Sequence, residues 1–200
     1  MSLRDKNAQN KIHNLELQMI KKNIKLNVHG IKKVSNNHVV NMYETKRIKY
    51  LDGFYMYTIQ QQIASHGILI FKKTLPNKKV KLSLFDPNGI KNINSGYKLQ
   101  FNKNIISYDL TPSKVWNDHF GHCAIWCLIF IILWNNFNQY NQNLFDKKIS
   151  GKDNYNYRRE FIDDIYRFIV NGKNFDTEDE TKKFIEKVKN KINDVILYNQ

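Results

Sequence analysis

Apolar residues near the start of the chain recur with the spacing of an α-helix. Ile12, Leu15 and Met19 lie three and four residues apart, and charged and amide side chains separate them. This pattern predicts an amphipathic helix over residues 7–27. The stretch that follows has only short apolar pairs, which favours a loop with one strand at residues 38–43.

Two further helical stripes lie in the last quarter of the chain. One runs through YRREFIDDIYRFIVNG, and the other follows Thr177-x-x-Glu180, a pattern typical of a capped helix start. We expect both segments to be helices that pack around the core. Their apolar positions are Phe161, Ile165, Phe168 and Ile169, then Phe184, Val188, Ile192, Val195 and Ile196. The polar run NNFNQYNQN, which comes before both, predicts a loop.

The middle of the chain has the alternation of β-strands. Apolar positions alternate in VKLSLF, at residues 80–85, and GILIF, at residues 67–71, is rich in β-branched and aromatic side chains. We expect two adjacent antiparallel strands, joined by a polar loop over residues 72–79. His66 then stands at the start of the first strand and Asp86 at the end of the second. These two ends lie side by side in an antiparallel hairpin.

An unbroken apolar run, GHCAIWCLIFIILW, extends from Gly121 to Trp134 and has a cysteine at its entrance. From Cys123 onward the run is 12 residues long, short of the roughly 20 residues that cross a bilayer. We therefore predict a buried central helix that begins at Cys123, and no membrane span. Cys127 is one helical turn further along, and we interpret it as a packing residue.

The composition is that of a folded chain, which we interpret as a single domain over residues 1–200. The 200 residues are 42% apolar and 13% aromatic, enough to bury a core. We divide the domain into an N-terminal helix with a basic extension (1–50), a core (51–138) and C-terminal helices (155–198). The predicted class is α+β, with a small antiparallel sheet packed on the central helix and flanked by the terminal helices.

The net charge of +14 is unevenly spread along the chain. The last 50 residues hold 10 basic and 10 acidic side chains, so the whole excess lies in the first three quarters. A positive field raises encounter rates with acidic partners. Nucleic acid is one such partner, and the contact with it would be non-specific. The sequence has no nucleic-acid-binding motif, so a solvated lysine surface is the simpler interpretation.

Two cysteines, Cys123 and Cys127, are too few for a disulfide framework, and no second pair completes a zinc site. We predict a reducing compartment and neither a metal nor another cofactor. The N-terminal segment MSLRDKNAQNK has no apolar stretch of the kind that signal peptides contain.

His66, Asp86 and Cys123 are the residue types of a nucleophilic thiol site. A carboxylate that accepts the imidazole N–H fixes the tautomer, while the other ring nitrogen faces the thiol. A histidinium and a helix N-terminus both favour the thiolate. Simpler interpretations exist: Asp86 begins the turn sequence Asp-Pro-Asn-Gly, His66 is a strand-end histidine, and the cysteine is buried in a basic globular domain.

The order of these motifs resembles a family of enzymes. A histidine at a strand start (SHGILIF), an acid after the next strand (LFDPNG) and a cysteine at the mouth of an apolar helix (GHCAIWCLIFI) are similar to the papain-like cysteine peptidases of the adenovirus-protease and SUMO-protease clan. The motifs more closely resemble proteins of large DNA viruses with the pattern His…(Asp/Glu)-Pro-x-Gly…Gly-x-Cys-x-x-Trp. The resemblance covers about residues 54–135 and implies a papain-like fold.

The resemblance implies Cys123 as nucleophile, His66 as general base and Asp86 as the acid that orients the base. The clan also places a glutamine shortly before the cysteine, and its amide helps to hold the oxyanion. The matching stretch here, TPSKVWNDHFGHC, has no glutamine, and Asn117 is our candidate for that role. Losing one oxyanion donor lowers rates by about 10²–10³, so a pseudoenzyme is an alternative. Ala124 also stands where the clan usually has glycine.

The expected function is that of a cysteine peptidase of viral type, with Trp116 and Trp126 as walls of the substrate cleft. It would cleave a peptide or isopeptide bond in a viral precursor or a ubiquitin-like conjugate, in host cytoplasm or in the virion. An acyltransferase that uses the same triad is the nearest alternative. A basic, non-catalytic viral protein that binds nucleic acid or structural proteins is an alternative of a different class.

Overall fold

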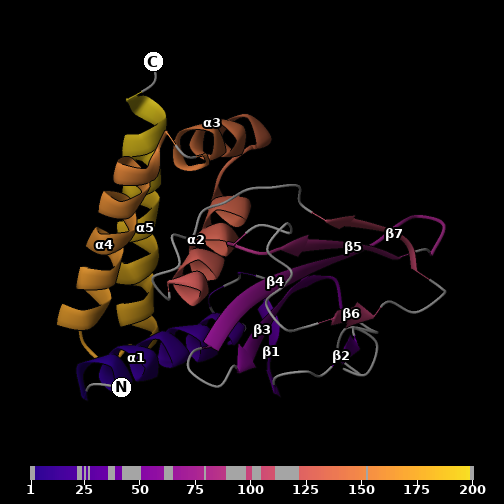
Figure 1. Ribbon diagram of the computed structural model, residues 1–200, viewed down its shortest axis with the longest axis horizontal. Coiled ribbons are helices and arrows are strands. Elements are labelled where there is room, and N and C mark those ends of the chain that lie inside the picture. Colours follow the sequence, from indigo (N-terminus) through magenta and orange to yellow (C-terminus); the bar gives the residue numbers. More distant parts are fainter. Residues whose placement is uncertain are drawn as a thin grey trace. The chain divides into compact units, whose positions relative to one another are not determined.

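The computed structural model describes residues 3–21, 24, 26, 28–35, 39–41, 51–60, 65–78, 80–88, 98–100, 105–110, 122–151 and 153–198. The chain forms two compact units. Asn27–Cys127 make up the first, which we call the sheet unit, and Met1–Leu26 with Leu128–Gln200 make up the second, the helical unit. The α+β class predicted from the sequence is confirmed (Figure 1).

The sheet unit contains a five-stranded sheet with the strand order β1-β3-β4-β5-β7. Its strands are β1 (Val28–Ser35), β3 (Gly53–Gln60), β4 (Ser65–Thr74), β5 (Val80–Phe85) and β7 (Ile105–Leu110). A second, two-stranded sheet pairs β2 (Val39–Asn41) with β6 (Lys98–Gln100). The strand expected at residues 38–43 is β2.

The five-stranded sheet is mixed, so the predicted antiparallel sheet is wrong at both edges. β4 pairs antiparallel with β3 and with β5. The outer pairings, β1 with β3 and β5 with β7, are parallel. Parallel neighbours need long crossover connections, and the local alternation of a sequence does not reveal which distant segments such connections join.

The predicted hairpin of β4 and β5 is confirmed. Leu69 is opposite Phe85, and Thr74 is opposite Val80. β4 has neighbours on both sides, and its consecutive residues Ile68, Leu69 and Ile70 are all buried. A strand covered on both faces has a continuous apolar run of this kind instead of a strict alternation.

Helix α2 (Cys123–Asn136) begins where the sequence predicts. The carbonyl of His122 accepts a hydrogen bond of 3.0 Å from the N–H of Trp126, so Cys123 is the first residue of the helix. Cys127 is completely buried, which confirms that it is a packing residue. Among the described residues, no helix has both the length and the apolar character required to cross a membrane.

The helical unit contains α1 (Leu3–Ile20), α3 (Gln139–Ile149), α4 (Tyr155–Asn171) and α5 (Glu178–Leu197). The loop predicted for NNFNQYNQN is wrong, because α3 begins within it. The side chain of Asn138 accepts a hydrogen bond of 2.9 Å from the N–H of Asn141, so a polar cap starts this helix. Phe145 and Ile149 are the buried residues that fix it to the unit.

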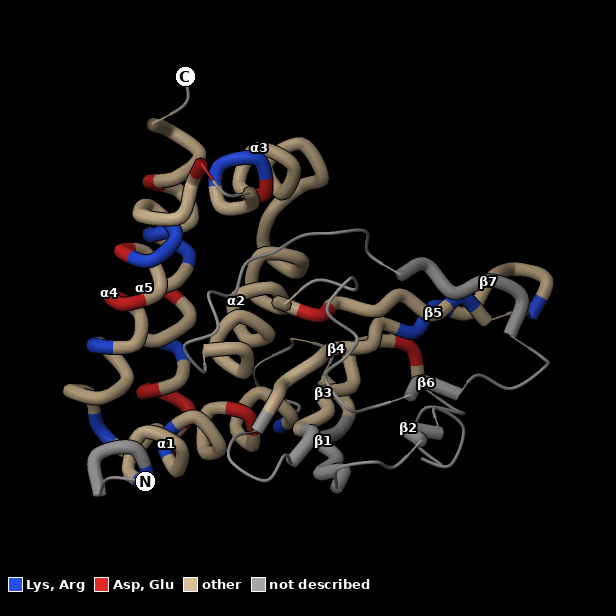
Figure 2. Tube along the Cα trace, viewed as in Figure 1, with Lys and Arg blue, Asp and Glu red and all other residues tan. Residues whose placement is uncertain are grey.

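The two C-terminal helices follow their predicted patterns. The hydroxyl of Thr177 accepts a hydrogen bond of 3.3 Å from the N–H of Glu180, which confirms the helix cap. α4 and α5 run side by side in Figure 1, and Figure 2 shows basic and acidic residues interspersed along both. The predicted stripe positions are buried, apart from a partly exposed Phe168.

Two buried cations hold the ends of helices in this unit. The Lys11 Nζ donates to the carbonyls of Val170, at 2.8 Å, and Gly172, at 2.6 Å. Arg158 donates to the carbonyls of Ile149 and Gly151, both at 2.7 Å. The last carbonyls of a helix have no partner inside it, and a positive charge there also suits the helix dipole.

Candidate functional site

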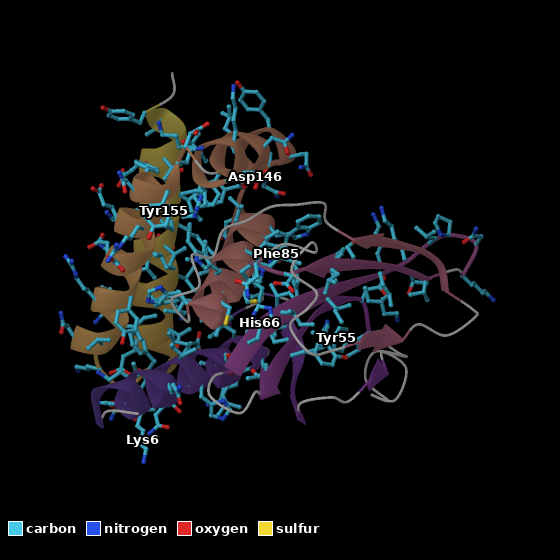
Figure 3. The ribbon with its side chains drawn as sticks, in the orientation of Figure 1. Lys6, Tyr55, His66, Phe85, Asp146 and Tyr155 are labelled. Atoms are coloured by element: carbon cyan, nitrogen blue, oxygen red, sulfur yellow. The ribbon has the colours of Figure 1, made fainter. Side chains whose placement is uncertain are left out.

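His66, Asp86 and Cys123 come together within the sheet unit. His66 is the second residue of β4, Asp86 directly follows β5, and Cys123 is the first residue of α2. Their exposed fractions are 5%, 6% and 4%, respectively. Figure 3 labels His66 at the start of β4, and Phe85, which precedes Asp86, at the end of β5. The three segments therefore converge as the sequence predicts, while the chemical role of the residues remains a prediction.

His66 is bound to Asp86 through one ring nitrogen. The Nε2 atom of His66 lies 2.9 Å from Oδ1 of Asp86, and both side chains are buried. The hairpin register explains the contact, because Leu69 is opposite Phe85 and the neighbouring ends of the two strands meet. Since a carboxylate only accepts hydrogen bonds, Nε2 carries a proton.

Asp86 is at the same time a turn residue. Its Oδ1 also accepts a hydrogen bond of 2.9 Å from the backbone N–H of Asn88, as an aspartate at the start of a tight turn often does. The two interpretations of this residue, as turn former and as partner of His66, are thus both correct. One oxygen atom serves both roles.

Asn88 is a member of the site that the sequence reasoning missed. Its side-chain amide lies 3.3 Å from Nδ1 of His66. Both ring nitrogens of His66 therefore face the turn Asp86–Asn88. The sequence alone gives no register for this hairpin, but when the observed β4–β5 register is continued past Phe85, Asn88 falls opposite His66.

The sulfur of Cys123 lies between β4 and the start of its own helix. Sγ accepts a hydrogen bond from the backbone N–H of Gly67 at 3.2 Å, and the side chain of Cys123 is close enough to His66 to help raise the pKa of the imidazole. The first turn of α2 adds the positive end of a helix dipole. Three positive or donating groups thus surround the sulfur.

The charge of His66 follows from these contacts. Burial by itself would lower the pKa of His66, but the hydrogen bonds and charges of Asp86 and Cys123 outweigh burial and raise this pKa to about 10. His66 is therefore an imidazolium at neutral pH. An imidazolium beside a cysteine favours the thiolate, which is the nucleophilic form of the residue.

Of the other predicted site residues, the structure describes only Trp126. Asn117 and Trp116 lie outside the described residues. Trp126 is completely buried, so its position does not support its predicted place as a wall of the substrate cleft. In the described part of the chain, no group of three or more His, Cys, Asp or Glu side chains could hold a metal ion.

Comparison of the sequence with protein-family models and with curated proteins finds no match. The geometry around Cys123 is therefore the basis for assigning a function. This geometry joins residues that are 20 and 56 positions apart in the sequence.

Proposed function

We propose that the protein is a cysteine peptidase, with Cys123 as nucleophile, His66 as general base and acid, and Asp86 as the residue that orients His66. The observation that carries the proposal is the position of His66. Its Nε2 binds Asp86 at 2.9 Å, and Cys123 is close enough to help raise the pKa of His66. A buried histidine with an acid on one side and a thiol on the other is the arrangement that nucleophilic catalysis by cysteine requires.

In the proposed reaction, the Cys123 thiolate attacks the carbonyl carbon of the scissile bond, and a tetrahedral oxyanion forms. Nδ1 of His66 then gives its proton to the leaving amine, which departs and leaves a thioester on Cys123. Water attacks the thioester while His66 accepts one proton. The thioester bond breaks, the acid is released, and the thiolate–imidazolium pair is restored. Asp86 remains ionised throughout.

Backbone amides in the first turn of α2 are the proposed donors to the oxyanion. First-turn amides have no acceptor inside their own helix, and their N–H groups point out of its N-terminus. The N–H of Cys123 belongs to this turn. The Asn117 amide is the second proposed donor, in place of the glutamine of the clan.

The proposed fold is papain-like, with the chain order His, Asp, Cys of the adenovirus-protease and SUMO-protease clan. Three features support it: a histidine near the start of one strand, an acid after the antiparallel neighbour, and a cysteine at a helix start. The proposed substrate is a protein, either a viral precursor or a ubiquitin-like conjugate. Host cytoplasm or the virion is the proposed location.

The test compares the alkylation of Cys123 by iodoacetamide at pH 6 and at pH 9. The ratio of the two rates cancels the effect of burial on access. An ordinary thiol, with a pKa near 8.5, reacts about 200-fold more slowly at pH 6 than at pH 9. For the wild type we expect the alkylation rates at pH 6 and pH 9 to be nearly equal. For His66→Ala we expect the ratio of the two rates to be that of an ordinary thiol.

Cys127→Ala is the matched control, because it removes the second cysteine, which is buried one helical turn after Cys123. We expect Cys127→Ala to keep both the rate and the pH ratio of the wild type. A wild-type Cys123 that behaves as an ordinary thiol, with no change in His66→Ala, would overturn the proposal.

Product analysis separates peptidase from acyltransferase activity. An activated ester should acylate Cys123, with the added mass found on the peptide that contains it. If water then resolves the thioester, the product is a free acid, whereas transfer to an added amine gives an amide and supports the acyltransferase alternative. DNA binding that weakens steeply with salt, in a protein whose thiol is ordinary, would favour the non-catalytic alternative.

A further inference from the structure

Gly67 follows His66 directly in β4 and is buried. It pairs with Thr58 of β3. Its backbone does not have a positive φ, unlike Gly53 and Gly151. Any residue could therefore adopt this backbone conformation, and the reason for a glycine at this position has to be space.

The space at Gly67 is taken by the start of α2. A methyl group at this position would lie 3.1 Å from both the Cα and the N of Ala124, and 3.4 Å from the carbonyl carbon of Cys123. All three are backbone atoms, so no side-chain rotation relieves the contact. An alanine at position 67 would require the first turn of the helix, which carries the sulfur, to move away from β4 by a few tenths of an ångström.

The backbone N–H of Gly67 is directed at the sulfur. It donates to Sγ of Cys123 at 3.2 Å. β5 ends at Phe85, opposite Leu69, so this strand does not extend as far as Gly67. A thiol is a weak acceptor, whereas a thiolate is a strong one, and the bond therefore favours the charged form of the cysteine.

We propose that Gly67 is a positioning residue of the thiol site. This inference rests on the proposed function. Its missing side chain lets the start of α2 approach β4, and its N–H holds the Cys123 sulfur next to His66. One short segment of β4 thus supplies both the imidazole and the donor that fixes the thiolate beside it. Gly67 acts through Cys123 and makes no contact with the reacting bond.

The first experiment compares Gly67→Ala with Ile68→Val by the same pH-dependent alkylation. Ile68→Val removes one buried methyl group from the next position of β4 and lowers stability without touching the sulfur. We expect Gly67→Ala to lower the alkylation rate at pH 6 by about 10- to 100-fold, the effect of losing one hydrogen bond to a charged group. Ile68→Val should keep the wild-type rate.

The second experiment does not require a folded Gly67 variant. The chain has 8 glycines, so labelling with ¹⁵N-glycine gives a simple amide spectrum. We expect the NMR signal of the Gly67 amide to shift with pH as the thiolate forms. The midpoint of this shift should equal the midpoint of the alkylation profile, and the shift should be absent in Cys123→Ala. Loss of the titration in Cys123→Ala would tie the donor to the sulfur.

The outcomes separate this inference from the proposed function. If the wild-type thiol is reactive at pH 6 and depends on His66, the proposed function stands. With that result, a Gly67→Ala variant that keeps the wild-type rate, or a Gly67 amide that does not titrate, would overturn the positioning role alone. A wild-type thiol of ordinary reactivity would overturn both.

Discussion

Asp86 holds His66 through a single oxygen atom, Oδ1, at 2.9 Å from Nε2. The same oxygen accepts a hydrogen bond from the backbone N–H of Asn88. The turn that follows β5 therefore orients the carboxylate of Asp86, and this carboxylate in turn orients the imidazole. His66, the proposed general base, is thereby held by the backbone geometry of the turn that follows the neighbouring strand.

Asp86→Asn should lower the rate of acyl transfer by about 10³- to 10⁴-fold, because an amide can donate to Nε2 and so impose the wrong tautomer on His66. The measurement is the rate of acylation of Cys123 by an activated ester. Asp52→Asn is the control, since Asp52 is an exposed acid that contacts Lys72 and Thr74 at the far end of β4. Equal rates for the wild type and Asp86→Asn would contradict the assigned role.

Asn88→Ala should reduce the same rate by about 2- to 10-fold, the effect of losing one side-chain contact at Nδ1 of His66. The backbone N–H that binds Asp86 remains in this variant, so the His66–Asp86 contact should survive. Asn143→Ala is the control, because it makes the same substitution on the exposed surface of α3. It should not change the acylation rate. A loss as large as that of Asp86→Asn would instead make Asn88 a catalytic residue.

The stability of the protein should depend on pH through His66. The pKa of this residue is raised from 6.5 to about 10 in the folded state. The stability that comes from its charge is therefore fully present below about pH 6.5 and is lost as the pH rises through about 10, with a slope of at most about 1.4 kcal/mol per pH unit. Urea unfolding of the wild type and of His66→Gln from pH 6 to pH 10 should show a shrinking difference. A difference that grows with pH would mean that His66 is neutral in the folded protein.

Arg158→Met should destabilise the helical unit by about 2–4 kcal/mol, because the buried carbonyl of Ile149 and the part-buried carbonyl of Gly151 lose a charged donor. Arg159→Met is the matched control. The Arg159 side chain is about half exposed, and it forms an ion pair with Asp163 on the surface of α4, a contact worth little. Thermal unfolding of the two variants measures the difference, and similar melting temperatures would count against a capping role for Arg158.

The local parts of the fold were predictable from the sequence. Cys123 begins its helix as expected, because the change from polar to apolar residues is sharp, and the hairpin follows from the alternation in β5 and the loop before it. Thr177 caps α5 through a pattern that involves only neighbouring residues. In each case the physical cause lies within a few positions of the chain.

Features that depend on distant residues were not predictable in this way. The parallel partners of β3 and β5 come from segments far away in the sequence. Asn138 starts a helix inside a polar run, because the buried Phe145 and Ile149 further along hold that helix in place. Gly67 needs to be a glycine only because Ala124 comes close to it. Single-sequence patterns contain propensities and periodicities, but they do not contain such contacts.

The hydrogen bonds from Lys11 to Val170 and Gly172 set an order for folding during synthesis. These contacts span 159 and 161 positions, and the helical unit consists of two separate segments of the chain. During translation, α1 has to wait for α4 before it reaches its partners, whereas the continuous sheet unit has by then emerged in full. The thiol site belongs to the sheet unit, which is one continuous segment of the chain. Its residues are therefore able to meet before the two segments of the helical unit come together.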